Sequence, residues 1–342
     1  MPDSGRHSPS QLLQCHRKLV YRQLNAPRES GDSDGVFYLG DVLEDLVESF
    51  LSELASQHGL YVQNSMYVNL DVEPENGESS VSFRGSTDPV LCDHDGVPVL
   101  PIEVKSKSED AMEYLDSVGT RHRAQAHAYV RGLNERMDAL GGERQLEEFA
   151  VLYIARETLE VRVFIEGFDS QFWASVVEWA SAHTRFRENL AGSSTFDDDV
   201  DGGVLPPGVP EEPEWECEYC AYRKRCGKDD SVPVSDVGVA GLLPLTRYSR
   251  AAVEAHMEAY PDVPVSPTVA YQHPSVLAGG HPVADWECRE CGEIPLDRVG
   301  WDGDVEDPPV CPSCGECSLR GPRPSRASVV ENNSVGGGDG GV

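Results

Sequence analysis

Two acidic residues and a lysine stand close together in strand-like stretches of the sequence. "GSTDPV" places Asp88 just before one apolar run, and "PIEVKSK" places Glu103 and Lys105 two positions apart in the next. Residues two apart in a strand point to the same face, so these three side chains can converge. Two carboxylates and the carbonyl of Val104 suit Mg²⁺ or Mn²⁺, which polarises a phosphate and lowers the pKa of a bound water. Lys105 can orient that water or neutralise charge in the transition state.

A surface salt-bridge face of a strand is the alternative interpretation, because charge pairs at this spacing are common. Two observations favour phosphodiester hydrolysis: the charged pair lies inside an apolar run, "VPVLPIEVK", and Asp88 lies in the partner run. From these residues alone, both interpretations remain open.

The same residues resemble the core motif of the PD-(D/E)xK nucleases, and two further motifs resemble RecB-like members. "GDVLE" resembles an upstream helix motif, which implies that Glu44 contacts metal; a solvated helix face is the alternative. "RAQAHAYV" resembles the Q-x-x-x-Y motif, which implies that Gln125 and Tyr129 lie on one helix face toward DNA or the active site. The alternative there is an amphipathic helix with Tyr129 half buried. His122 and His127 flank the pair and are interpreted as surface or supporting residues.

Three cysteines lie within ten positions in "CEYCAYRKRC", and a tetrahedral zinc ion or a four-iron cluster normally takes four protein ligands. CRISPR-associated RecB-like exonucleases, and related nucleases of helicase complexes, bind a [4Fe–4S] cluster through one cysteine before the nuclease core and three after it. "CHRKLVY" resembles the sequence around the first of these. The resemblance implies that the cluster ligands are Cys15, Cys217, Cys220 and Cys226. Zinc on the same four thiols is the alternative.

Basic and aromatic residues surround these cysteines in an otherwise acidic chain. Phosphate pairing and base stacking are what a single-strand channel uses. We therefore expect contacts with DNA from Arg17, Lys18, Arg223, Lys224 and Arg225. The alternative is that the aromatic rings pack around the cluster.

A second cysteine group has the spacing of a zinc ribbon. Two Cys-x2-Cys pairs are separated by nineteen residues, and each pair is followed by glycine. The predicted zinc ligands are Cys288, Cys291, Cys311 and Cys314. Cys317 could substitute for Cys314 or stay unligated, and Cys92 is interpreted as a small buried hydrophobe. A structural zinc staple and a binding module are equally consistent with this spacing.

Hydrophobic periodicity predicts the elements that must position these residues. Helices are predicted over 8–24, 37–59, 109–137 and 170–189. Strands are predicted over 66–72, 79–86, 89–93, 97–106, 149–155 and 160–166. "DHDG" predicts a hairpin between 89–93 and 97–106. The resemblance implies an α/β fold with a mixed sheet flanked by helices. The expected organisation is a nuclease domain over 1–230 with a linker at 191–214, a connecting segment over 231–285, a zinc ribbon over 286–320 and a disordered tail over 321–342.

Composition places limits on location and chemistry. The 59 acidic and 28 basic residues give a formal charge of -31, and the acids are dispersed with few lysines. This pattern favours a cytosolic protein that works at very high salt concentration. An ordinary acidic protein is the alternative. No run approaches the ~20 apolar residues of a membrane span, and "MPDSGRHSPS" has no signal core, so a cytoplasmic location is expected. The absence of GxxxxGK[ST] argues against an ATP-driven motor in this chain.

Together, these observations predict a Mg²⁺- or Mn²⁺-dependent deoxyribonuclease with a [4Fe–4S] cluster and Zn²⁺. The resemblance implies an exonuclease that acts on single-stranded DNA or DNA ends, in CRISPR adaptation or DNA repair, with CRISPR integrase proteins or a helicase as partners. A non-catalytic adaptor that keeps the nuclease fold and the cluster to hold DNA or a partner is the alternative. A zinc-ribbon interaction protein is a third interpretation, which leaves the charged hairpin unexplained.

Overall fold

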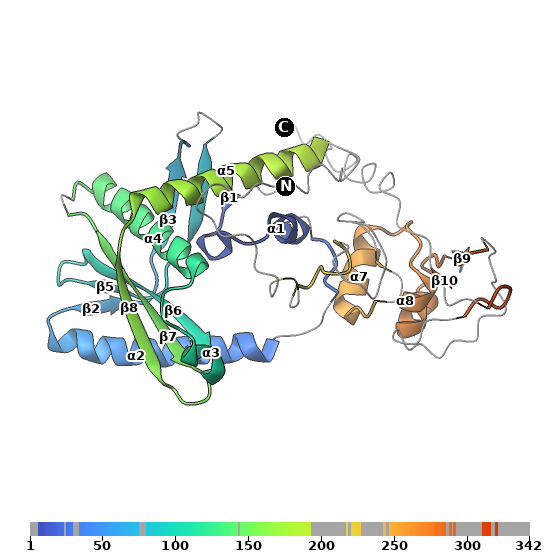
Figure 1. Ribbon diagram of the computed structural model, residues 1–342, viewed down its shortest axis with the longest axis horizontal. Coiled ribbons are helices and arrows are strands. Elements are labelled where there is room, and N and C mark those ends of the chain that lie inside the picture. The colour runs from blue at the N-terminus through green and yellow to red at the C-terminus, as the bar shows by residue number, and fades with distance from the viewer. Residues whose placement is uncertain are drawn as a thin grey trace, which may run out of the picture. The chain divides into compact units, whose positions relative to one another are not determined.

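The computed structural model forms two compact units (Figure 1). It describes residues 6–23, 25–29, 34–74, 80–142, 144–192, 217, 220–226, 242–243, 246–284, 287–288, 290–291, 310–315 and 319–320. The first unit comprises Met1–His16, Asp32–Ala191 and Asp201–Glu212. The second comprises Arg17–Gly31, Gly192–Val200 and Pro213–Val342.

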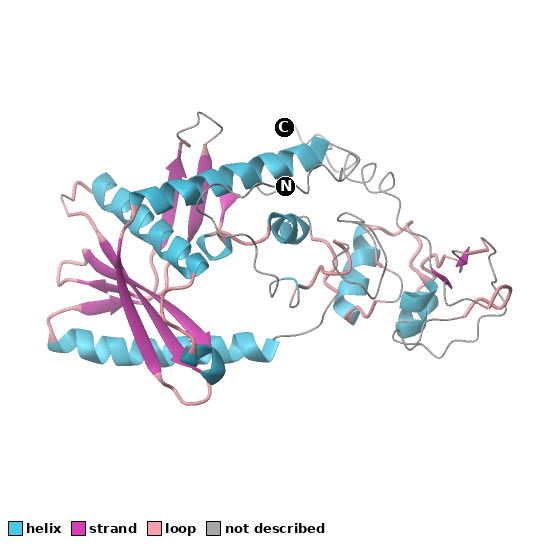
Figure 2. Ribbon diagram, viewed as in Figure 1, coloured by secondary structure: helices cyan, strands magenta, loops and turns pink. Residues whose placement is uncertain are grey.

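A mixed five-stranded sheet is the centre of the first unit (Figure 2). Its strands, in spatial order, are β2 (Tyr61–Gln63), β5 (Val90–Cys92), β6 (Pro98–Lys107), β7 (Glu148–Ala155) and β8 (Val161–Gly167). β6 pairs antiparallel with β5 and parallel with β7, so the predicted hairpin and the predicted mixed α/β fold are both confirmed. A smaller sheet contains β1 (Arg6–His7), β4 (Val81–Ser86) and β3 (Tyr67–Val72).

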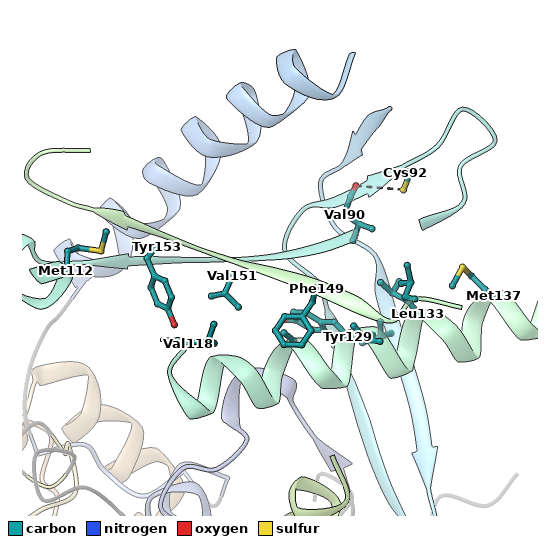
Figure 3. Packing of buried hydrophobic residues seen from close by; sticks show 14 of the residues in the cluster. Val90, Cys92, Met112, Val118, Tyr129, Leu133, Met137, Phe149, Val151 and Tyr153 are labelled. Carbon is teal, nitrogen blue, oxygen red and sulfur yellow. Dashed lines mark hydrogen bonds between the residues drawn. The ribbon is translucent and has the colours of Figure 1, made fainter. Parts of the chain in front are cut away.

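Helices cover the two faces of the large sheet. Helix α2 (Asp34–Gln57) packs Leu43 and Val47 onto Val104 and Leu152. Helix α4 (Thr120–Ala139) packs onto the alternate residues of β7, which form the buried cluster of Figure 3. Because successive residues of a strand face opposite sides, α2 and α4 lie on opposite faces of β6 and β7. Helix α5 (Ser170–Gly192) completes the unit.

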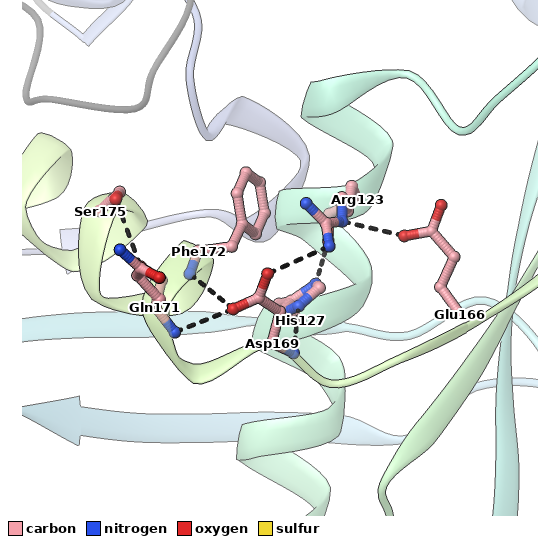
Figure 4. Close-up of polar contacts among 7 residues, drawn as sticks. All are labelled: Arg123, His127, Glu166, Asp169, Gln171, Phe172 and Ser175. Atoms are coloured by element: carbon pink, nitrogen blue, oxygen red, sulfur yellow. Dashed lines mark hydrogen bonds and ion pairs between the residues drawn. The ribbon is translucent and has the colours of Figure 1, made fainter.

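The start of α5 is tied to α4 by a polar network (Figure 4). His127 is fully buried; its Nδ1 lies 2.8 Å from the carbonyl of Arg123, and its Nε2 accepts from the Asp169 amide at 3.0 Å. Arg123 pairs with Glu166 at 2.9 Å and Asp169 at 3.3 Å. Both ring nitrogens of His127 are therefore satisfied in the neutral state; of the surface or supporting role expected for His127, its burial excludes the surface one.

The helix predicted over 8–24 is wrong as one element. The structure has a 3-10 turn, η1 (Pro9–Gln11), and a separate helix, α1 (His16–Gln23). Leu13 between them is nearly buried and has a φ of 57°. Its carbonyl accepts a hydrogen bond from Nε of Arg121 at 3.1 Å. A long-range contact thus accompanies the break that local periodicity could not reveal.

The helix predicted over 109–137 is also interrupted. It divides into α3 (Glu109–Glu113) and α4, and the chain between them positions the N-terminal end of α4. The amide of Gly119 donates to the hydroxyl of Tyr153 on β7 at 3.0 Å. The interruption therefore coincides with an anchor on the sheet.

The second unit contains short helices in the region predicted as a connecting segment. They are α7 (Arg250–Ala259), α8 (Pro267–Gln272) and α9 (Pro274–Ala278). Ser249 and Ser266 cap the first two by accepting from the amides of Ala252 and Val269. Strands β9 (Glu287–Cys288) and β10 (Leu319–Arg320) form an antiparallel pair.

Some predictions fall outside the described residues. These are the linker beyond Gly192, the tail over 321–342, and Cys317. Among the helices that the structure does describe, none combines the length and the apolar character needed to cross a membrane.

Candidate active site

The structure brings Asp88, Glu103 and Lys105 together. Asp88 lies in the loop before β5, while Glu103 and Lys105 lie on β6 opposite Val151 and Tyr153 of β7. Nζ of Lys105 contacts Oε1 of Glu103 and lies 3.8 Å from Oδ2 of Asp88. The three charges therefore form one cluster on the face of the sheet that α4 covers.

The loop that carries Asp88 is held at both ends. The Val104 amide donates to Oδ2 of Asp88 at 3.0 Å, which ties the carboxylate to β6. One residue earlier, Thr87 exchanges two hydrogen bonds with Met66, each 2.9 Å long. The position of the Asp88 carboxylate is thus set by its contact with β6, and the residue before it is held by Met66, which precedes β3.

Glu103 is the most unusual group in this cluster. Its side chain is fully buried, and within the described part of the chain its Oε2 has no hydrogen-bond partner. Burial, helped by the charges of Asp88 and Glu44, raises the pKa of the Glu103 carboxyl to about 8 against the lowering effect of Lys105. A buried carboxylate surrounded by like charge is costly unless a cation joins it.

Lys105 responds to the same surroundings in the opposite sense. Burial alone would lower the pKa of its ammonium group, but Glu103, Asp88 and Glu44 outweigh burial and raise that pKa. Lys105 therefore stays charged at neutral pH.

Glu44 and Tyr129 complete the surroundings from two helices. The charge of Glu44, on α2, acts on Glu103, Lys105 and Tyr129, so the upstream helix contributes a third carboxylate. On α4, Nε2 of Gln125 donates to the hydroxyl of Tyr129 at 2.8 Å, and both side chains are buried. Burial, together with the charges of Glu103, Asp88 and Glu44, raises the pKa of Tyr129, so its hydroxyl remains protonated.

The donor set fits a hard divalent cation. The site combines three carboxylates with one lysine, and the most buried carboxylate has an oxygen that lacks a partner among the described residues. Oxygen ligands with excess negative charge suit Mg²⁺ or Mn²⁺. A bound cation would relieve the repulsion that raises the pKa of Glu103.

The second cysteine group is assembled as four thiols. Sγ of Cys288 lies 3.6 Å from that of Cys314, and Sγ of Cys291 lies 3.8 Å from that of Cys311. All four sulfurs lie within 4.8 Å of one another. A tetrahedral ion with metal–sulfur bonds of about 2.3 Å needs sulfurs about 3.8 Å apart. The arrangement therefore fits a single tetrahedral metal ion.

A glycine turn supports this metal-binding group. Gly315 has a φ of 81°, in the left-handed region that glycine tolerates, and its amide donates to the carbonyl of Cys311 at 2.9 Å. Residue 288 also belongs to the β9–β10 pair. A metal on the four thiols would therefore join the described residues 288, 291, 311 and 314 beside the β9–β10 pair.

The first cysteine set is divided between the two units. Cys15 belongs to the first unit, and Cys217, Cys220 and Cys226 belong to the second. Cys220 and Cys226 pack beside Tyr21, Ala26 and Tyr222. None of the nine described cysteines takes part in a disulfide. A metal cluster bound by this first cysteine set stays a prediction.

The basic residues predicted to contact DNA have different environments. Arg17 donates to the carbonyl of Cys226 at 3.4 Å. The carboxylate of Glu29 accepts from the amides of Lys224 and Arg225 at 2.7 and 2.6 Å. Burial raises the pKa of Glu29 to about 7, although these two donors and the nearby cations lower it.

The expectation for Arg225 needs correction. Its side chain is 0% exposed, and its charge acts on the buried Tyr248 and His256. The side chain therefore belongs to the interior of the second unit and is not available to DNA. Arginine is usually exposed, so the sequence alone favoured the wrong environment. Arg17, Lys18, Arg223 and Lys224 are partly exposed, and their contacts with DNA stay predictions.

Sequence reasoning missed a second group of residues beside the carboxylates. Lys107 follows Lys105 on the same face of β6, and His122 lies 2.8 Å from the hydroxyl of Tyr153. The two-residue spacing that identified Lys105 could also have identified Lys107. The contact between His122 and Tyr153 joins residues far apart in the chain and left no local signal.

Comparison with known proteins identifies one family. The family model of the PD-(D/E)XK nuclease superfamily matches residues 2–227. The crystal structure of SSO0001 is similar at 17% identity with a TM-score of 0.38, over 66% of this chain and 87% of that one. The crystal structure of LHK-Exo in complex with dAMP is similar at 12% identity with a TM-score of 0.36, over 55% and 90%. No curated protein matches the chain.

Proposed function

Because the chain belongs to the PD-(D/E)XK nuclease superfamily, we propose that it is a Mg²⁺- or Mn²⁺-dependent deoxyribonuclease whose centre lies around Glu103. The observation that carries this proposal is the contact of Lys105 with a fully buried Glu103 beside Asp88. As a salt bridge for stability this arrangement is poor, since burial of its charges costs more than a surface pair would. The same arrangement suits a bound cation, because a cation would offset the negative charge of the clustered carboxylates.

The proposed ligands are the carboxylates of Glu44, Asp88 and Glu103 and the carbonyl of Val104. When bound, the cation supplies a water of lowered pKa and polarises the scissile phosphate. The Val104 amide keeps Asp88 in place through its hydrogen bond to Oδ2. Lys105 stays charged and can orient the attacking water or stabilise charge on the phosphate. Tyr129, which accepts from Gln125, keeps its own hydrogen to donate.

We further propose that the substrate is single-stranded DNA or a DNA end and that the reaction is exonucleolytic. The motif of Gln125 and Tyr129, and the division of four cysteines around the nuclease core, support this finer assignment by resemblance. The same resemblance supports a role in CRISPR adaptation or DNA repair, in the cytoplasm, beside integrase proteins or a helicase.

The proposed metal inventory is one [4Fe–4S] cluster on Cys15, Cys217, Cys220 and Cys226 and one Zn²⁺ on the second cysteine group. Protein purified without oxygen should contain about four irons and about one zinc per chain. Cys15→Ala and Cys217→Ala should each lose the iron completely and keep the zinc. A Cys15→Ala protein that retains full iron would mean that the fourth ligand lies elsewhere.

The decisive experiment on function is cleavage of end-labelled single-stranded DNA at high salt with Mn²⁺ or Mg²⁺. The parent protein should degrade the DNA, and Asp88→Asn should not, while both give the same circular dichroism spectrum. Glu135→Gln, at an exposed position of α4, is the matched control and should cut normally. Binding of DNA without cleavage by the parent under every metal condition would favour the adaptor alternative.

A further inference from the structure

A second cation lies beyond Lys105 on the same strand. Lys107 is the last residue of β6, and side chains at positions 103, 105 and 107 share the face toward α4. Two residues of a strand span about 6.7 Å. That step is comparable with the distance between neighbouring phosphates of an extended DNA strand, so a strand following β6 could meet Lys105 and Lys107 with successive phosphates.

His122 lies beside both lysines. The charges of Lys105 and Lys107 act on its ring, and its Nδ1 lies 2.8 Å from the hydroxyl of Tyr153. That hydroxyl already accepts from the Gly119 amide at 3.0 Å, so its own hydrogen is available to Nδ1 of His122. This arrangement favours the tautomer that carries hydrogen on Nε2. Burial and the nearby cations lower the pKa of His122 to about 3, so the ring is a neutral donor.

Positive charge accumulates here although the protein is strongly acidic. Within the described part of the chain, no ion pair joins Lys107 to a carboxylate. Burial and the charge of Arg156 lower the pKa of Lys107. Arg121 adds a further charge near His122. Lys107 lies 5.4 Å from the ring centroid of Tyr153, a contact that orients the ammonium group without neutralising it. Lys107 is therefore a partly buried cation without a carboxylate partner among the described residues, and a bound anion would offset the cost of its burial.

We infer that Lys107 and His122 form a phosphate-binding subsite for the nucleotide next to the scissile bond. Lys107 supplies the charge, and Nε2 of His122 supplies a neutral hydrogen bond. Tyr153 fixes the orientation of the imidazole, and Arg121 strengthens the local positive potential. This inference rests on the proposed nuclease function, because its ligand is the DNA strand that enters the same centre.

The first test compares Lys107→Gln and Lys107→Arg with Arg136→Gln. Arg136 is an exposed residue in the last turn of α4, about 21 Å along the helix from His122, and its loss removes the same charge. Lys107→Gln should raise KM on the order of tenfold and change kcat by about twofold or less. Lys107→Arg should restore the parent KM, and Arg136→Gln should leave it unchanged.

Salt dependence separates a phosphate contact from a general loss of charge. Binding of a fluorescent single-stranded oligonucleotide is measured over a salt series, in a Glu103→Gln background that prevents cleavage. Lys107→Gln should reduce the slope of log K against log salt by about 0.7, the value for one single-strand phosphate. Arg136→Gln should keep the slope of the background protein.

A neutral methylphosphonate, moved one linkage at a time along the oligonucleotide, identifies the phosphate. At one position next to the scissile linkage, the methylphosphonate should weaken binding to the Glu103→Gln protein by about tenfold. The same methylphosphonate should not weaken binding to the protein that carries both Glu103→Gln and Lys107→Gln. Equal losses with and without Lys107 at every linkage would overturn the inference. A parent protein that neither binds nor cuts DNA would overturn the proposed function itself. A parent that cuts DNA, with Lys107→Gln matching its KM and salt slope, would overturn only the subsite.

Discussion

The sheet of the first unit and the thiol group of the second unit are stabilised in different ways. Around β6 and β7, large side chains such as Phe149, Tyr153 and Leu133 are completely buried. Each such side chain contributes about 1.5–3 kcal/mol to folding. Among the described residues of the thiol group, by contrast, Cys288 and Cys311 are buried, while Cys291 and Cys314 are exposed.

This difference separates the two proposed uses of metal in one chain. The first unit has a complete apolar core, so its proposed cation has chemistry to perform and adds little to the fold. Among the described residues of the thiol group, four side chains are potential metal ligands, so a metal bound there would supply folding energy. Removal of the first metal should therefore stop a reaction, and removal of the second should unfold a segment.

The largest expected effect is on the reaction. Glu103→Gln should reduce cleavage by about a thousandfold or more, because it removes a proposed charged ligand of the cation. The melting temperature should stay within a few degrees of the parent, since a buried charge that was costly is removed together with an ion pair. Cleavage rates and calorimetry on the same samples test both parts. Lost activity that came with a collapsed melting temperature would contradict the division of roles.

The next effect concerns the thiol group. Cys288→Ser should lose the zinc and make the chain near residues 288–315 sensitive to protease, because apparent zinc-binding energies of about 10–16 kcal/mol are folding energy in such segments. DNA cleavage by the first unit should persist. Cys92→Ala, which changes a buried cysteine of the β5 strand, is the control and should keep its zinc. Proteolysis patterns that do not differ between these two variants would refute the metal-dependent fold.

The smallest effect is on the pH dependence of stability. Burial lowers the pKa of His127 from 6.5 to about 4. Between these two pH values the His127 side chain is therefore protonated in the unfolded chain and neutral in the folded protein. Stability from this group is complete above pH 6.5 and is lost as the pH falls toward 4. By pH 5 the loss should be about 2 kcal/mol.

Urea unfolding at pH 7 and pH 5 measures this loss. His127→Gln should be less sensitive to acid than the parent, whereas His58→Gln, at an exposed position, should match the parent. Other buried histidines, such as His16 and His183, change stability in the same direction and remain in both variants. Identical acid sensitivity of all three proteins would contradict a neutral His127 whose two ring nitrogens are both hydrogen-bonded.

The predictable features were those with a local period. Alternation and the "DHDG" turn were enough to place Asp88 near Glu103 and Lys105, because a hairpin leaves few other arrangements. The spacing of the second cysteine group likewise predicted a set of thiols that the structure assembles. In both cases the residues on which the prediction depends lie close together in the sequence.

The missed features depend on residues distant in sequence. The break at Leu13 accompanies a contact with Arg121, and the orientation of His122 depends on Tyr153. Burial of Arg225 arises among Glu29, Tyr248 and His256 of the second unit. Propensity cannot anticipate such contacts, because each becomes favourable only after the partners have been brought together.

The parallel pairing of β6 with β7 sets the order in which a growing chain can become active. Residues 102–107 of β6 pair with 150–155 of β7, and the segment between them must cross over before the strands meet. A nascent chain that has not yet exposed β7 therefore carries Glu103 and Lys105 on a strand that can pair with β5 but lacks its second neighbour. We expect the catalytic centre to be absent on the ribosome until that strand emerges, so that synthesis itself delays the appearance of a DNA-cutting activity.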